Sequence, residues 1–87
     1  MNFADQTMLA TGFEKAIIGL DTTGDVFRVI YDIDKIVEIL MEDNEMTEED
    51  ALEHLDYNIL GGWVGEGTPI YAYGGDHDRI LELMSNL

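Results

Sequence analysis

The spacing of apolar residues changes at residue 32, and this change limits the chain to a fold that contains both strands and helices. Val26–Tyr31 (VFRVIY) is rich in β-branched and aromatic residues, which favour a strand. After it, Ile33, Ile36, Val37 and Leu40 recur at the spacing of one helical stripe. The sequence therefore predicts a strand followed directly by a helix, with Asp32 or Asp34 as the helix cap.

The rest of the chain supplies four further elements and one turn. Residues 14–20 form a strand that is joined to Val26–Tyr31 by the turn residues 21–25, as in a β-hairpin. A second helix begins at Thr47 and ends near residue 60, a third strand covers residues 70–73, and a closing helix covers residues 76–87. The order β-β-α-α-β-α predicts an α+β fold, with a small antiparallel sheet of about three strands and two to three helices packed on one face. We expect a single domain over residues 1–87, with residues 1–12 as a loosely docked arm.

The balance of charge decides which partners the chain can attract. Nineteen acidic residues stand against four basic ones, so the formal net charge is −15. Such a field repels nucleic acids, which are bound through Lys and Arg, and it repels anionic membranes. It attracts a basic protein surface. The absence of cysteine fits a reducing compartment, and neither a secretory signal nor an apolar run of membrane-spanning length is present, so a cytoplasmic location is expected.

Several motifs resemble those of a known family. They are an A-I-I-G strand at Ala16–Gly19, Tyr31-Asp32 at a strand end, M-T-x-E-x-A at Met46–Ala51, and an N-x-x-G-x-W-V-G-E-G-T-P loop that ends at Pro69. In this combination the chain resembles a family of small uncharacterised proteins of tailed phages, over about two-thirds of its length. The resemblance implies a phage-encoded accessory protein that acts in the cytosol of its host. It implies no particular chemistry.

The acidic stretch between residues 42 and 56 is the first candidate site. It holds eight carboxylates and neither lysine nor arginine. One interpretation is a negative surface that imitates a phosphate backbone and so inhibits a host nucleic-acid-binding or defence protein. The other is a solvated helix face whose first acids suit the positive end of the helix dipole. For the binding interpretation we single out the residues with the most suitable positions: Glu45, Glu48, Glu49, Glu53, Asp56 and Trp63.

A second hypothesis places a small, nucleotide-like ligand near the glycine-rich loop at residues 61–67. Aromatic rings, an amide and a hydroxyl gather there in the sequence, and the pocket would be lined by Tyr31, Tyr57, Asn58, Trp63, Glu66 and Thr68. The shortage of basic residues argues against a phosphorylated ligand. A third hypothesis is a minor virion or assembly component.

Catalysis and metal binding have weak support in the sequence. The stretch at Asp43–Thr47 lacks the central glycine of a calcium-binding EF-hand loop. The two histidines, His54 and His77, stand in no known zinc-binding spacing, and without cysteine a nucleophile is hard to assign. We therefore expect a non-enzymatic protein without cofactor or metal. A homodimer through an exposed strand edge is compatible with the thin core.

Overall fold

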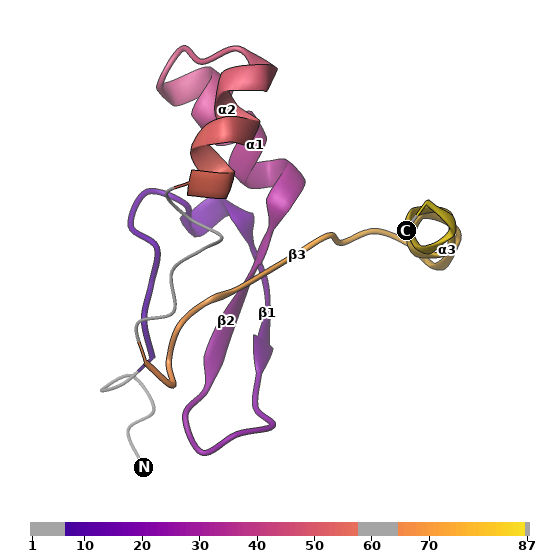
Figure 1. Ribbon diagram of the computed structural model, residues 1–87. Coiled ribbons are helices and arrows are strands. Elements are labelled where there is room, and N and C mark those ends of the chain that lie inside the picture. The colour runs from indigo at the N-terminus through magenta and orange to yellow at the C-terminus, as the bar shows by residue number, and fades with distance from the viewer. Residues whose placement is uncertain (1–6, 58–64, 87) are drawn as a thin grey trace.

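The computed structural model describes residues 7–57 and 65–86 of the chain. Its elements follow one another as the short 3-10 helix η2 (Glu14–Ala16), β1 (Ile17–Asp21), β2 (Arg28–Asp32), α1 (Ile33–Asp43), α2 (Glu48–Leu55), β3 (Ile70–Ala72) and α3 (His77–Ser85) (Figure 1). This is the predicted order β-β-α-α-β-α, and the α+β class is confirmed. None of the described helices has both the length and the apolar character to cross a membrane.

The sheet is mixed, which corrects the expectation of a wholly antiparallel sheet. Its strand order is β1-β2-β3, with β2 in the middle. β1 and β2 form the expected antiparallel hairpin, with a bulge between Ile17 and Gly19, whereas β3 runs parallel to β2. The reason is the long connection between β2 and β3, which contains both α1 and α2. A connection of this length can bring the chain back to the start of β2, as parallel pairing requires.

The helix starts follow the local capping signals. The Asp32 carboxylate accepts hydrogen bonds from the backbone N–H groups of Asp34 and Lys35, at 2.9 and 3.4 Å. The Thr47 hydroxyl accepts one from Asp50 N at 3.2 Å, which confirms Thr47 as the cap of α2. These side chains satisfy donors that the first turn of a helix leaves unpaired. Because Asp32 is also the last residue of β2, strand and helix join without a loop.

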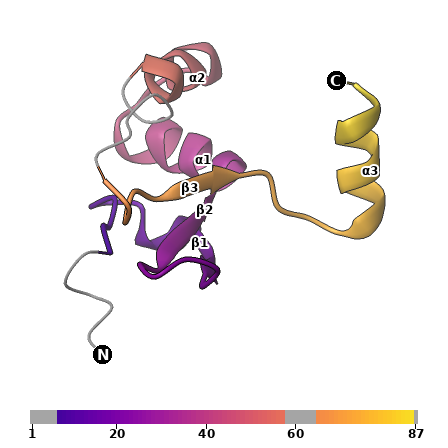
Figure 2. The same cartoon turned by 60° about the horizontal axis from the view of Figure 1, so that its bottom comes forward.

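The core joins Val29 and Tyr31 of β2 to buried residues of α1 and α2, which lie beyond the end of β2 (Figures 1 and 2). Tyr31 is fully buried, and its ring stacks on Tyr71 of β3. Its hydroxyl accepts a hydrogen bond from Ala10 N at 2.8 Å. Thr7 Oγ1 donates to Phe27 O, and Met8 N donates to Gly67 O. Residues 7–10, which belong to the segment expected as a loose arm, are therefore docked on the body.

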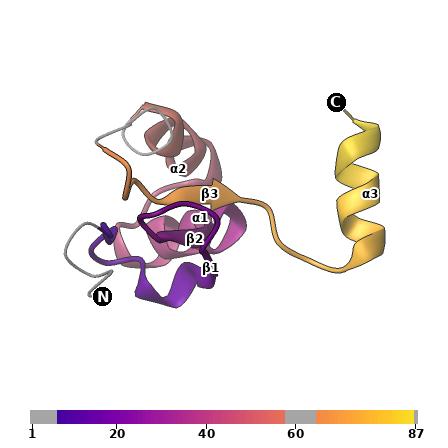
Figure 3. The ribbon, with the colours of Figure 1, turned by 90° about the horizontal axis from the view of Figure 1, so that it is seen from below.

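The helix α3 stands apart from this body. The views in Figures 2 and 3 agree that an extended segment after β3 carries α3 to the side of the sheet. None of its residues is buried. The expectation of helices packed on one face of the sheet is thus wrong for α3, whereas α1 and α2 contribute to the core beyond the end of β2.

Candidate protein-binding face

The turn between α1 and α2 places a carboxylate in an unusual backbone conformation. Glu45 has a φ of 57°, in the left-handed region that non-glycine residues rarely adopt. The backbone around it closes the end of α1, because Asn44 N and Met46 N both donate to Leu40 O. Met46 is half-buried against the core, so the turn is fixed from below while Glu45 points to solvent.

The helix α2 exposes its acids because its apolar residues are used on the other side. Ala51 and Leu55 are buried against α1, four positions apart on one helical stripe. The remaining positions of α2 face water, apart from the half-buried His54. All the predicted acids of this face are exposed, and so are their neighbours: Glu42, Asp43, Glu45, Glu48, Glu49, Asp50, Glu53 and Asp56. We call these eight residues the acidic face.

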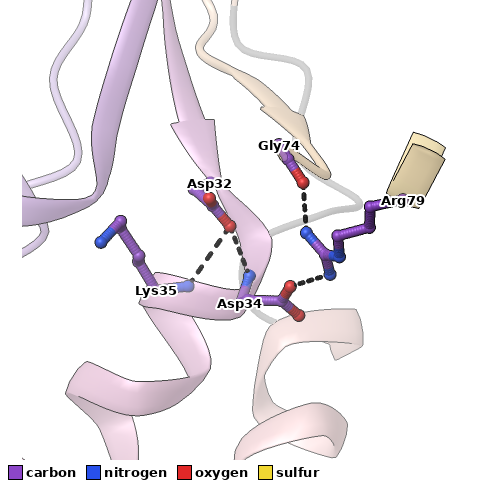
Figure 4. A network of polar contacts seen from close by, with 5 residues as sticks. All are labelled: Asp32, Asp34, Lys35, Gly74 and Arg79. Carbon is purple, nitrogen blue, oxygen red and sulfur yellow. Dashed lines mark hydrogen bonds and ion pairs between the residues drawn. The ribbon is translucent and has the colours of Figure 1, made fainter. Parts of the chain in front are cut away.

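The acidic face lies within a stretch of the sequence, residues 36–78, that contains no lysine or arginine. Arg28 donates to the backbone oxygen of Thr68 at 2.7 Å, beside β3. Arg79 donates to Gly74 O and pairs with the Asp34 carboxylate (Figure 4). Lys15 and Lys35 line a shallow pocket with Glu38 and Glu42 near the middle of α1. Both arginines thus serve contacts away from α2.

The residues of the ligand hypothesis are not brought together in the described part of the chain. Tyr31 is fully buried in the core, whereas Tyr57 is 80% exposed at the end of α2. Thr68 is buried, and its hydroxyl donates to Gly65 O at 2.6 Å within its own loop. Asn58 lies outside the described residues, and so does Trp63, which belongs to both predicted sites.

Glu66 instead faces the β1–β2 hairpin. It lines an open pocket of about 280 Å³ with Arg28, Asp21 and residues 23–26 of the turn. Asp21 accepts hydrogen bonds from the hydroxyl and the backbone N–H of Thr23, at 2.6 and 2.9 Å. These bonds, the side-chain one first, lower the pKa of the Asp21 carboxyl below its ordinary value. They are the local bonds expected of a turn residue, and they stabilise the hairpin.

Neither histidine belongs to a cluster of possible metal ligands in the described part of the chain. Within residues 7–57 and 65–86, no three His, Asp or Glu side chains gather in a way that could hold a metal ion. His77 Nδ1 lies 3.5 Å from a carboxylate oxygen of Asp78, and both side chains are almost fully exposed. This is an arrangement of neighbouring residues in the first turn of α3.

Two features that matter for the surface had no local signal in the sequence. The Arg79–Asp34 pair joins residues 45 positions apart, and no spacing rule connects them. The uncovered position of α3 could not be read from its amphipathic pattern, because the same pattern is typical of a packed helix.

Comparison with protein-family models, with curated proteins and with solved structures found no match to this chain.

Proposed function

We propose that this protein is a non-enzymatic acidic binding module that inhibits or modulates a protein with a basic surface. The single observation that supports it most is the acidic face, in which eight exposed carboxylates gather on α2 and beside it, and Glu42 at its edge shares a pocket with Lys15 and Lys35. The motif resemblance adds a setting, in which a phage-encoded protein acts on a nucleic-acid-binding or defence protein in the cytosol of its host.

The acidic face suits this role because its charges are held on a short, well-anchored support. Thr47 caps α2, and Ala51 and Leu55 fix its orientation against α1. Acids on consecutive turns of one helix then present a row of negative charge, as a nucleic-acid backbone does. A basic surface that normally binds phosphates would meet a similar pattern of charge, and nucleic acid and this protein would compete for it.

Electrostatics of this kind acts mainly on the rate of association. Opposite potentials steer two proteins together, and association rate constants can rise from about 10⁵–10⁶ to about 10⁸ M⁻¹s⁻¹ at low salt. At physiological ionic strength, charges further apart than about 8 Å are largely screened. The complex should therefore form fast at low salt and more slowly at high salt, with a smaller change in its dissociation rate.

The experiment begins with capture of proteins from a bacterial lysate at low and high salt, with identification of the retained proteins by mass spectrometry. Association rates are then measured with the captured protein for wild type, for Glu49→Gln/Glu53→Gln on α2, and for the matched control Glu38→Gln/Glu82→Gln. Both double variants remove two exposed carboxylates from helices. We expect the association rate to fall several-fold for the first variant and little for the control.

An association rate that does not respond to salt would overturn the proposal, as would equal losses in the two double variants. Retention of DNA or RNA by the purified protein at physiological salt would contradict it as well, because the proposal requires that polynucleotides are repelled.

A further inference from the structure

The helix α3 presents an apolar side that residues 7–57 and 65–86 leave uncovered. Leu81 and Met84 are 48% and 60% exposed, and Ile80 and Leu83 are only half-buried. These four residues occupy one side of the helix, whereas Asp78 and Glu82 lie on the other. A separate helix of nine residues is barely stable in water, so a surface that covers this apolar side is needed to hold it.

The direction of α3 is fixed at its base by its own chain. Arg79 donates to Gly74 O and to the Asp34 carboxylate at the start of α1 (Figure 4). Gly75 has a φ of 133°, and a Cβ there would lie 2.7 Å from Arg79 Cδ, so only glycine suits this position. The Arg79 side chain thus links α3 to the body, while the helix itself stands to one side (Figure 3).

The sheet also has an apolar face that the described part of the chain leaves partly exposed. Tyr31 and Tyr71 point to the core, so their neighbours in the pairing register, Ile30 and Ile70, point to the opposite face together with Ala72. Gly19 is paired with Ile30, and its position lies on the same face, since a Cβ at Gly19 would lie 3.4 Å from Ile30 Cδ1. None of the described helices covers this face (Figure 2).

Ile18 extends this apolar face at the bulge of β1. Its Cδ1 atom lies 3.3 Å from the place that a Cβ on Gly74 would occupy, so its side chain crosses the sheet towards the end of β3. The Ile18 side chain is nevertheless 45% exposed. The four apolar side chains of what we call the open sheet face are Ile18, Ile30, Ile70 and Ala72.

We propose that the protein forms a symmetric homodimer in which α3 of each copy packs on the open sheet face of the other. One chain supplies both apolar surfaces, and in a two-fold arrangement each is covered once. The placement of the charges leaves room for a second copy as the occupant, although each copy carries a net charge of −15. The acidic face lies on the α1–α2 turn and on α2, whereas the open sheet face carries apolar side chains, so two copies can meet without placing their strongest negative fields in contact.

The size of the contact is adequate for a dimer. Eight apolar residues of one copy take part, four from α3 and four from the sheet. At roughly 60 Å² of surface lost by each, the two copies bury on the order of 1,000 Å², which is about the minimum for a specific interface.

The test uses two variants that damage opposite halves of the interface. Met84→Glu places a charge on the apolar side of α3, and Ile18→Lys places one on the open sheet face. Leu52→Glu is the matched control, because Leu52 is a similarly exposed leucine on α2, outside the interface. Light scattering after size-exclusion chromatography gives the mass of each species, and circular dichroism checks that each variant is folded.

We expect wild type and Leu52→Glu at twice the chain mass of 9.8 kDa. The dissociation constant of the dimer should rise at least about tenfold in each interface variant alone, since a charge enters an apolar contact. A mixture of the two variants should restore a dimer, because it contains one undamaged helix and one undamaged sheet face that fit each other.

A monomeric wild type at high concentration would overturn the proposal, including the case in which α3 closes on its own sheet. A mixture that stays monomeric although both variants are folded would overturn it too. The experiment contains no host partner, so its failure leaves the proposed binding of a basic protein untouched.

Discussion

The ring of Tyr31 stacks on the ring of Tyr71, with centroids 5.8 Å apart and planes inclined by 24°. Because Tyr31 lies in β2 and Tyr71 in β3, the pair joins the only parallel strands of the described sheet on the side that faces the core. Burial, and to a lesser degree the neighbouring Tyr31, raises the pKa of the Tyr71 hydroxyl. The two rings connect the hairpin, the third strand and, through Ala10, the docked N-terminal segment.

Replacing Tyr31 by Phe should destabilise the fold by about 1–3 kcal/mol, because the partly buried Ala10 N–H loses its acceptor. Tyr73→Phe serves as the control, since Tyr73 is half exposed and should change stability little. Chemical denaturation of both variants measures the difference. If Tyr31→Phe were as stable as wild type, water would replace the Tyr31 hydroxyl as the acceptor without loss of stability.

Replacing Glu45 by Asn separates stability from binding. Asn adopts the left-handed conformation at φ 57° more easily than Glu, so the free energy of unfolding should stay equal or rise by up to about 1 kcal/mol. The same substitution shortens the side chain and removes a charge from the acidic face, so association with a basic partner should slow. Denaturation and association rates are measured on one preparation. Faster association of the variant would contradict the role given to Glu45.

Gly75→Ala should weaken the attachment of α3. The added methyl group would clash with the Arg79 side chain, and alanine rarely adopts a φ of 133°. Together these effects should destabilise this conformation by about 1–3 kcal/mol. Hydrogen exchange should then become faster in residues 77–85 than in α1. Gly24→Ala is the control, because a Cβ there lies 3.7 Å from the nearest atom, Val26 O. Unchanged exchange in α3 would mean that Arg79 does not fix the helix.

Salt should act in opposite directions on folding and on binding. Screening reduces repulsion among nineteen acids, so the melting temperature should rise by roughly 5 °C, about 1 kcal/mol for a domain of this size, between low and high salt. Binding to a basic protein should weaken over the same range. Thermal denaturation and association rates in one salt series test both signs. A falling melting temperature would show that internal ion pairs outweigh the repulsion.

The Asp21 carboxyl should make the hairpin sensitive to acid. Its pKa is lower in the folded chain, so its bonds to Thr23 stabilise the fold above the ordinary carboxyl pKa. This contribution is lost as the pH falls through the lowered value. The stability difference between wild type and Asp21→Asn, measured over acid pH, should therefore shrink towards low pH. A stability difference that does not change with pH would show that the charge of the Asp21 carboxylate does not contribute to it.

Features that depend on neighbouring residues could be predicted from the sequence. The caps at Asp32 and Thr47, the turn after Asp21 and the exposure of the α2 acids follow from local bonding and from the helical period. The parallel pairing of β3 and the position of α3 depend on contacts between distant segments, which no local pattern contains. The burial of Tyr31 could not be predicted, because strand alternation gives two faces and does not tell which one is buried.

Asp32 ends β2 and begins α1, and it lies close to Gly74, where an added Cβ would come within 3.1 Å of its carboxylate. Because no loop separates β2 from α1, a tilt of α1 should rotate β2 and shift the segment that carries α3. A bound protein that tilts α1 would therefore also change the position of α3.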